Sequence, residues 1–257
     1  MNRIIILGAM IKEERLRLIM REINLHNKVL SNDLSLLLNV SEDTVRRDIK
    51  ELVEGGFILK VHGGAISKSL VTPFIQDNDV YALSDKRKIA VKASSLLKNN
   101  TVFITEGGTT ILEFAKSIPS NVNAAFFTIS PQVAITLAGH SNLDVITIGG
   151  KLNKDANLHT GSSVINQLSE IKADLCILGA NGFSLEDGLT DIDWEVVQVK
   201  KAIIRASRKT AVLCISEKLN STRRLKVCDT NQVDYLITEL DPDNHLLAPY
   251  KKDIIVI

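Results

Sequence analysis

Cysteine is scarce in this sequence, with 3 residues among 257. Cys176, Cys214 and Cys228 each lie in a short apolar run, and their spacing matches neither a zinc site nor a disulfide framework. Isolated cysteines of this kind behave as small core residues of a reducing compartment. The pattern argues against a disulfide-stapled fold and a metal centre, and we expect no cofactor.

Net charge is almost absent, because 31 Lys and Arg residues face 30 Asp and Glu residues, which leaves +1. Residues 1–68 carry +2 and the remainder −1. A chain so close to neutrality does not coat nucleic acid by bulk attraction. Any binding to nucleic acid has to come from the local placement of a few basic side chains.

Long apolar runs are also missing from the start of the chain. The apolar run in MNRIIILGAMIKEE is too short for a membrane span or for a signal peptide with its cleavage site. We therefore expect a cytoplasmic protein with no membrane partner. Residues 1–10 fit an extra strand or an imprecise start equally well. The length leaves room for one large domain and a small one.

Apolar periodicity predicts two helices in the first 38 residues. In residues 11–24 the apolar side chains recur at spacings of three and four, which gives one buried helix face. A shorter helix follows, with Ser31 as its N-cap and with Leu34, Leu37 and Leu38 as its buried stripe. The sequence Asn-Val-Ser at 39–41 then predicts a tight turn.

A third helix begins after this turn, with Ser41 as its N-cap. Val45, Ile49 and Leu52 lie within about 60° of one another on a helical wheel and face the core. Two helices, a three-residue turn and a third helix form a helix-turn-helix, whose last helix enters the major groove of DNA by its N-terminal end.

The third helix supplies the candidate DNA contacts. Arg47 falls nearly opposite the core face, and Arg46 lies on the flank beside Thr44. The candidates on this helix are Ser41, Thr44, Arg46, Arg47 and Lys50.

An alternative interpretation is that the two arginines are solvated surface residues. Asp43, Asp48 and Glu51 lie on the same helix and can pair with them. The case for DNA contact therefore depends on the whole ordered set of elements.

The segment after the third helix predicts a β-hairpin wing. An apolar run at 57–61 precedes a Gly63-Gly64 turn and a second short apolar stretch. Lys60 and His62 lie near the tip, where they can meet phosphate or the minor groove.

Strand-like and helix-like segments alternate beyond residue 84. We assign residues 1–66 to a DNA-binding domain, 67–84 to a linker and 85–257 to an α/β domain with a largely parallel sheet. The expected strands read TVFIT, AAFFTI, DVITIGG, ADLCILGA, TAVLCIS and VDYLIT. The expected helices read DKRKIAVKASSLLK, TTILEFAKSI, PQVAITLAG, SSVINQLSE and DWEVVQVKKAIIRASR.

Glycine-rich loops follow three of these strands. Gly107-Gly108 with Thr109 and Thr110 would surround a helix N-terminus, which is a ready anion site. A Gly-Gly turn with a threonine cap is equally ordinary loop chemistry. Gly149-Gly150 and the glycines of 179–182 lie at the same sheet edge, because the carboxyl ends of parallel strands meet there. The three loops together favour a ligand pocket.

The first part of the chain resembles the winged helix-turn-helix of DeoR-type bacterial transcription regulators. The resemblance rests on residues 30–65, LSNDLSLLLNVSEDTVRRDIKELVEGGFILKVHGGA, with Val-Arg-Arg-Asp-Ile and the terminal His-Gly-Gly-Ala. It implies that Thr44, Arg46 and Arg47 contact a double-stranded DNA operator.

Residues 74–240 resemble the sugar-phosphate sensor domain of the same family, a Rossmann-like α/β fold related to ribose-5-phosphate isomerase and the CoA transferases. Where that family usually has Asp-Ser-Gly-Thr-Thr, Thr-Asn and Gly-Ala-Asp-Gly, this chain has residues 106–110, 128–130 and 179–182 with altered polar groups. The resemblance implies that a phosphorylated sugar contacts Glu106, Gly107, Gly108, Thr109, Thr110, Ser130, Gly149, Gly150, Glu195, Lys200 and Lys218.

Two of these residues have plain alternative roles. Lys200 is also compatible with a solvated position on a helix. Glu195 is also compatible with a carboxylate in the first turn of a helix, where the helix dipole favours negative charge.

These features predict a repressor of carbohydrate-metabolism genes that is controlled by a sugar phosphate and assembles as a homo-oligomer, a dimer or a tetramer. Two alternatives stay open. One is an isomerase-like enzyme with a DNA-binding head, although the five histidines share no motif and no acid–base pair stands out. The other is a regulator that has lost its effector. We expect no catalytic residues.

Overall fold

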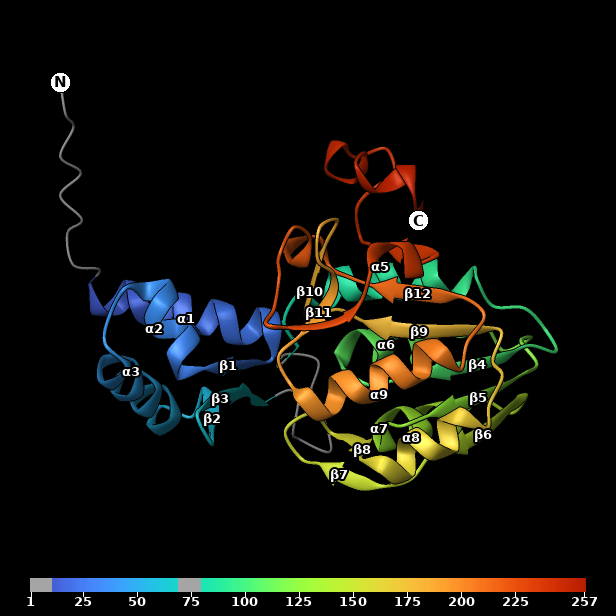
Figure 1. The fold of residues 1–257 in the computed structure, drawn as a ribbon, viewed down its shortest axis with the longest axis horizontal. Coiled ribbons are helices and arrows are strands. Elements are labelled where there is room, and N and C mark those ends of the chain that lie inside the picture. Colours follow the sequence, from blue (N-terminus) through green and yellow to red (C-terminus); the bar gives the residue numbers. More distant parts are fainter. Residues whose placement is uncertain (1–10, 69–79) are drawn as a thin grey trace. The chain divides into compact units, whose positions relative to one another are not determined.

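The computed structural model describes residues 11–68 and 80–257. The expectation for residues 1–10 and most of the expected linker at 67–84 lie outside these ranges. The chain divides into two compact units, Met1–Ser69 and Leu70–Ile257 (Figure 1). The expected linker is shortened at both ends, because strand β3 continues through Ser67 and helix α5 already begins at Leu83.

The N-terminal unit contains the three expected helices, α1 (Lys12–His26), α2 (Ser31–Leu38) and α3 (Glu42–Glu54). Ile19 and Ile23 of α1 are fully buried and pack in one core with Leu34, Val45 and Ile49 from the other two helices. The apolar periodicities therefore identified the core faces of α1 and α3 correctly.

Two expectations for α2 were wrong. Ser31 is the first helical residue and its amide donates to the carbonyl of Gly63 at 2.8 Å, while Leu30 holds the N-cap position without a side-chain cap. Leu37 is 57% exposed. Ser31, Leu34 and Leu38 share the buried face, and Leu37 lies about a quarter turn from the centre of that face.

The turn into α3 forms as expected. Asn39 adopts a left-handed conformation at φ 51°, and Ser41 Oγ accepts a hydrogen bond from the amide of Thr44 at 3.3 Å. Val45 and Ile49 turn inward as a result. The three-residue turn and the cap fix the direction in which α3 leaves α2.

The wing is a three-stranded sheet rather than a two-stranded hairpin. β2 (Ile58–Val61) and β3 (Gly64–Ser67) pair in antiparallel register, and β1 (Lys28–Leu30) pairs with the other side of β3. β1 was not expected, because three residues between two helices carry no readable alternation. Its presence ties the wing to the loop between α1 and α2.

Replacing Gly64 with alanine is expected to destabilise the N-terminal unit by about 1–3 kcal/mol or more, because overpacking forces the backbone to shift. A Cβ atom at this position would lie 1.9 Å from the carbonyl oxygen of Val29. Urea unfolding followed by circular dichroism measures the loss. Lys60→Ala, an exposed change in β2, is the matched control, and an equal effect of both variants would contradict the packing argument.

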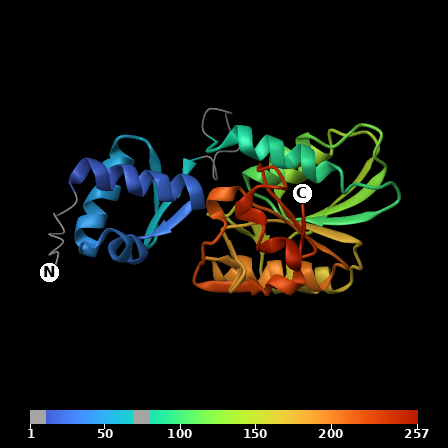
Figure 2. The ribbon, with the colours of Figure 1, turned by 90° about the horizontal axis from the view of Figure 1, so that it is seen from above.

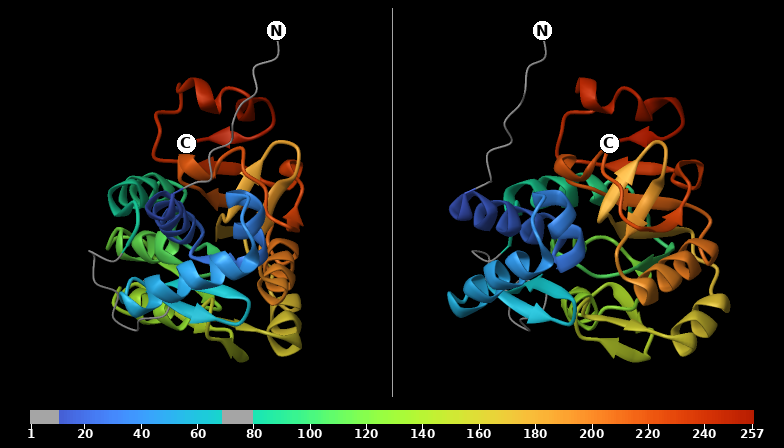
Figure 3. Two further views of the ribbon diagram at one scale, coloured as in Figure 1. Left: turned by 90° about the vertical axis from the view of Figure 1, so that its left-hand side faces the viewer. Right: turned by 60° about the vertical axis from the view of Figure 1, so that its left-hand side comes forward.

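The C-terminal unit is built on a seven-stranded parallel sheet with the strand order β15-β14-β12-β9-β4-β5-β6. The strands are β4 (Val102–Thr105), β5 (Ala124–Thr128), β6 (Leu143–Thr147), β9 (Leu175–Gly179), β12 (Thr210–Leu213), β14 (Tyr235–Ile237) and β15 (Ile255–Val256). The six expected strands are all present. β15 is an unexpected seventh that pairs with β14 at one end of the sheet. Figure 3 shows this last segment of the chain in red.

Helices cover both faces of this sheet (Figure 2). One layer holds α5 (Leu83–Ser94), α6 (Thr109–Lys116) and α7 (Pro131–Leu137), and the other holds α8 (Ser162–Ser169) and α9 (Trp194–Arg205). All five were expected. Two small antiparallel sheets flank the main one, made by β7 (Lys151–Asn153) with β8 (Leu158–Thr160), and by β10 (Gly182–Ser184), β11 (Gly188–Asp191) and β13 (Leu225–Cys228).

The three cysteines are buried and unpaired in the C-terminal unit, as expected of core residues. Burial raises the pKa of the Cys176 and Cys214 thiols to about 12. The thiols are therefore protonated and pack as small apolar groups.

Candidate functional site

The two arginines of α3 differ in their surroundings. Arg46 forms ion pairs with Glu42 at 2.9 Å and with Asp43 at 3.2 Å, all on the exposed surface. Arg47 is exposed, and within the described ranges it has no ion pair or hydrogen bond. The alternative of simple surface pairing therefore holds for Arg46 but not for Arg47.

Two other acidic residues of α3, Asp48 and Glu51, are paired with basic residues of α1. Asp48 is buried and accepts two hydrogen bonds from Arg15, from Nε at 2.7 Å and from Nη2 at 3.0 Å. This pairing raises the pKa of Arg15. Glu51 pairs with Lys12 at 2.6 Å. Both carboxylates are thus kept away from Arg47, and they fasten α3 to α1.

The remaining expected DNA contacts lie in two places. Thr44 is half-buried at the capped start of α3, with its Oγ1 2.9 Å from Ser41 Oγ. Lys50 is exposed, 3.7 Å from Glu54 on the same helix. Lys60 and His62 are exposed on the wing, in β2 and its turn.

In the C-terminal unit, the first two strand-end loops meet. Gly107 passes so close to Ser130 that an added Cβ would lie 2.8 Å from Ser130 Oγ. Gly108 has φ 93°, a conformation that suits glycine, and it begins α6, where Thr109 is buried and Thr110 half-buried. Ser130 caps α7 by accepting from the amide of Val133.

A buried ionic cluster lies beside these loops. Lys200 Nζ is 3.4 Å from Glu106 and 2.9 Å from Asp191, and it donates to the carbonyl of Gly179 at 3.0 Å. Glu106 in turn accepts from the amide of Gly179. The alternative of a solvated Lys200 does not hold, since its side chain is buried and its amine is enclosed by three oxygens.

Burial governs the protonation of this cluster. It raises the pKa of Glu106 to about 7, with Asp191 adding to the shift and Lys200 opposing it. For Lys200, the charges of Asp191 and Glu106 outweigh burial and raise its pKa. For Asp191, Lys200 outweighs burial and lowers the pKa. Asp191 Oδ2 is paired in charge but has no hydrogen-bond partner in the described parts of the chain.

Three cations hold the loop that follows β9. Lys200 donates to the carbonyl of Gly179, Lys218 to that of Ala180 at 2.8 Å, and Arg223 to that of Asn181 at 3.4 Å. Lys218 lies in the 3₁₀ turn η2 (Ser216–Lys218) directly beyond β12 and is 8% exposed. The expected residues Lys200 and Lys218 are thus brought to the same loop.

Glu195 belongs to a different group. Its carboxylate accepts from Thr160 Oγ1 at 3.1 Å and pairs with Lys151 at 3.3 Å. Gly150 passes close to the backbone of Thr160, and the carbonyl of Gly149 accepts from Gln167 at 2.8 Å. These residues gather around β7 and β8.

Sequence reasoning missed Asp191 and Lys86. Asp191 lies on β11, a short strand that the pattern did not reveal, and it is 85 positions from Glu106 along the chain. Lys86 is 3% exposed on α5. A signal for it was available, because it shares its helix face with Ile89, Ala90 and Ala93 at spacings of three, four and seven.

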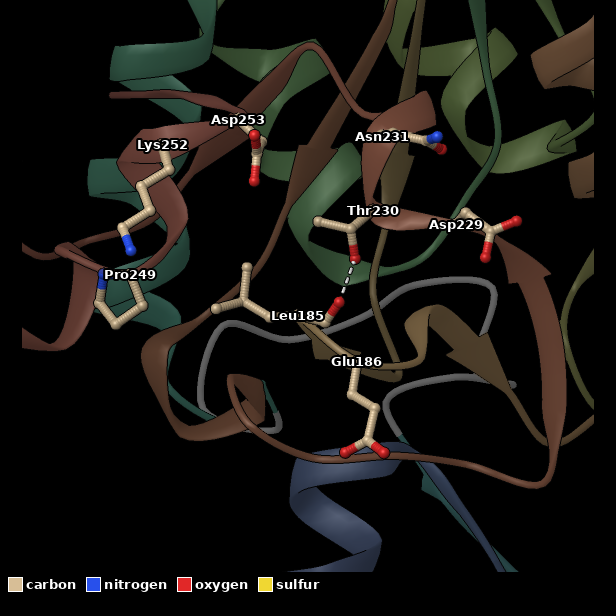
Figure 4. A pocket seen from close by; sticks show the side chains of 8 residues that line it. All are labelled: Leu185, Glu186, Asp229, Thr230, Asn231, Pro249, Lys252 and Asp253. Atoms are coloured by element: carbon tan, nitrogen blue, oxygen red, sulfur yellow. Dashed lines mark hydrogen bonds between the residues drawn. The ribbon is translucent and has the colours of Figure 1, made fainter.

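Two pockets of the C-terminal unit lie away from these residues. One of about 450 Å³ is lined by eight residues, Leu185, Glu186, Asp229, Thr230, Asn231, Pro249, Lys252 and Asp253 (Figure 4). Another, of about 350 Å³, lies between α9 and β13. Neither lining includes an expected effector residue.

Comparison with known families decides the classification of the chain. A family model described as the DeoR C terminal sensor domain matches residues 82–240, and one described as the DeoR-like helix-turn-helix domain matches residues 15–70. The chain belongs to the DeoR family. The expected fold, a small winged helix-turn-helix and a larger α/β domain, is confirmed.

Curated relatives in the DeoR family align over most of their length. The HTH-type transcriptional regulator GolR of Listeria innocua is 32% identical, over 93% of this chain and 94% of the relative. The HTH-type transcriptional repressor GlcR of Bacillus subtilis is 32% identical, over 91% of each. The glycerol-3-phosphate regulon repressor of Escherichia coli is 29% identical, over 83% and 85%.

Solved structures that resemble this DeoR-family chain include ribose 5-phosphate isomerase A from Methanocaldococcus jannaschii, with a TM-score of 0.38, 18% identity and coverage of 52% and 53%. The eIF2B delta subunit from Chaetomium thermophilum has a TM-score of 0.43, 15% identity and coverage of 79% and 66%. The expected relation to CoA transferases stays a prediction. Within residues 11–68 and 80–257, no helix is both long and apolar enough to span a membrane.

Proposed function

We propose that the protein is a DNA-binding transcriptional repressor of carbohydrate-metabolism genes. A phosphorylated sugar that binds to its C-terminal unit either releases it from DNA or promotes its binding to DNA. The observation that carries this proposal is the capped, exposed start of α3. There Arg47 has no partner among the described residues, while neighbouring acids pair with Arg46 and with α1. The names of the relatives, among them a glycerol-3-phosphate regulon repressor, support both the repressor function and the phosphorylated effector.

The two arginines would divide the contact with DNA. Arg47 points away from the core face that holds Val45 and Ile49, so it reaches base edges when α3 enters the major groove. Arg46 is held on the flank by Glu42 and Asp43, in a position suited to a backbone phosphate. Lys60 and His62 on the wing would add phosphate or minor-groove contacts.

The effector would bind at the carboxyl edge of the parallel sheet. Gly107, Gly108 and Thr109 present the start of α6 there, and Lys218 brings a buried cation to the neighbouring loop. Lys200 serves this site indirectly, because it holds Glu106 and Asp191 in place. Coupling to DNA requires that the effector bind two arrangements of the protein with different affinity.

Assembly follows from the way such proteins read DNA. Repeated half-sites are matched by closed oligomers with two-fold symmetry, so we propose a homodimer or a tetramer. We also propose that the chain catalyses no reaction. Glu106 is a strand-end carboxyl with a pKa raised to about 7, and it is 3% exposed and bonded to Gly179. A general base has to reach its substrate.

The effector site is tested by thermal unfolding of the full chain with a panel of phosphorylated sugars. A ligand at about 100 times its Kd stabilises the native state by about 2.7 kcal/mol, which raises the melting temperature by several degrees. Lys218→Met should abolish this shift, whereas Lys209→Met, at an exposed cation beyond α9, should retain it. A wild-type shift that survives Lys218→Met would contradict the assignment.

A further inference from the structure

A second buried lysine lies at the start of the C-terminal unit. Lys86 stands on the first turn of α5 and is 3% exposed. Its neighbours Arg87 and Lys88 lie at the surface and pair with Glu113 and Asp85. The amine of Lys86 instead donates to the backbone carbonyl of Tyr81 at 2.6 Å.

Lys86 lies at the edge of the sheet where the strands end. The C-terminal end of α5 leads through residues 95–101 directly into β4, so the first turn of α5 lies at the opposite, carboxyl edge. Tyr81 connects it to the segment that carries Lys218. Its hydroxyl lies 2.8 and 2.9 Å from the carboxylate oxygens of Glu217, which precedes Lys218 in η2.

Among the residues that the structure describes, neither lysine forms an ion pair with a carboxylate. The hydrogen-bond acceptors of Lys86 and Lys218 are neutral carbonyls, those of Tyr81 and Ala180. Two ammonium groups buried on adjacent segments repel each other and lose hydration. Such a pair is stabilised by an anion that reaches both.

The two carboxylates whose charges act on Lys86 and Lys218 are engaged with other cations. Glu113 pairs with Arg87 at 3.1 Å and with Lys116 at 2.6 Å. Asp191 pairs with Lys200 at 2.9 Å. The local balance of charge therefore favours an added anion.

Burial and the charges of nearby groups act on the protonation of both lysines. Burial, helped by the charge of Lys218 and opposed by Glu113, lowers the pKa of Lys86 to about 7. Burial, with Lys200 and Arg223, lowers the pKa of Lys218 to about 8, while Cys214 and Asp191 oppose it. An anion between them would raise both values, so that binding near pH 7.5 takes up protons.

Lys86 also supports an unusual turn. Ala82 has φ 51° and ψ 38°, a left-handed conformation that a residue with a side chain rarely adopts. The amide of Lys86 donates to the carbonyl of Ala82 at 3.0 Å, and its side chain holds Tyr81. A charged amine donates a stronger hydrogen bond than a neutral one, so protonation of Lys86 tightens this turn. The sensor-domain match begins at this same residue, 82.

We propose that Lys86 and Lys218 together bind the phosphoryl group of the effector, and that Lys86 transmits its presence to the Tyr81–Ala82 turn at the start of the C-terminal unit. The proposal rests on the effector function proposed above. It adds a second anion-binding lysine and the segment that responds to the anion.

The test uses the full chain with inorganic phosphate as the probe. Calorimetric titration at pH 7.5 in two buffers of different ionisation enthalpy gives the affinity and the proton uptake. Lys86→Met should weaken phosphate binding by about tenfold or more and remove most of the proton uptake, and Lys86→Gln, which keeps a donor for Tyr81 without the charge, should do the same. Lys88→Met, on the exposed face of α5, is the control and should bind as the wild type does.

Hydrogen exchange at the Lys86 amide reports the turn. Phosphate should slow this exchange in the wild type and in Lys88→Met, and leave it unchanged in Lys86→Gln. Equal phosphate affinity in wild type and Lys86→Met would overturn the proposal. No phosphate binding by the folded wild type, or unchanged exchange in the wild type, would overturn it as well.

Operator binding by the same samples separates a failure of the anion site from a failure of the proposed repressor function. A chain that binds operator but not phosphate refutes the anion site, whereas Lys86-dependent phosphate binding without specific DNA binding supports the site and refutes the repressor function.

Discussion

Replacing Arg47 with alanine is expected to weaken binding to the DNA upstream of the protein's own gene by about tenfold to a hundredfold, and to change binding to random DNA far less. Arg47 is exposed on α3 and has no partner among the described residues. A side chain of this kind can form a bidentate contact only with the correct base, so the contact is made only at the correct DNA sequence. Fluorescence anisotropy with labelled duplexes at fixed salt measures both affinities.

Arg46→Ala is the matched comparison, one position away on the same helix. Because Arg46 is assigned to a phosphate, its loss should lower affinity uniformly across sequences and reduce the salt slope by about one. The roles are reversed if Arg46→Ala changes sequence preference while Arg47→Ala only lowers affinity uniformly.

Replacing Lys200 with methionine is expected to destabilise the C-terminal unit by about 3–5 kcal/mol, because removal of one partner leaves buried charge uncompensated. Glu106 and Asp191 would then face each other at 3% and 2% exposure without a cation. Urea unfolding followed by fluorescence isolates this unit, since the single tryptophan of the chain, Trp194, lies in it. Lys201→Met, at the adjacent half-buried position, is the control and should cost little.

A second substitution tests the physical reason for this loss. Adding Glu106→Gln or Asp191→Asn to Lys200→Met removes one of the two uncompensated carboxylates and should restore part of the stability. If Lys200→Met unfolds at the same urea concentration as Lys201→Met, the cluster contributes nothing to the stability of the fold.

The helix-turn-helix was readable from sequence because its determinants are local. Core positions recur at helical spacing, Ser41 caps α3 from three residues away, and one short turn sets the angle between helices. The exposure of Leu37 was not readable. It depends on how the eight-residue helix α2 is rotated against the other two helices. Ser31 lies on the buried face, and this rotation leaves Leu37 exposed.

The ionic cluster could be predicted only in part. Glu106, Lys200 and Lys218 were identified by resemblance to a family, and their convergence follows from the parallel order of the strands. Asp191 depends on a small sheet assembled from distant segments. Lys86 was missed because of its residue type and not because of its distance along the chain, since a lysine in a charged run is ordinarily assigned to the surface.

The most direct measurement of the central claim is binding of the full chain to its own upstream DNA, with and without phosphorylated sugars. We predict that this fragment is bound about a thousandfold or more tighter than random duplex, and that one phosphorylated sugar changes the affinity by about fivefold or more. Equal binding to both duplexes, or a specific complex that no phosphorylated sugar affects, would contradict it.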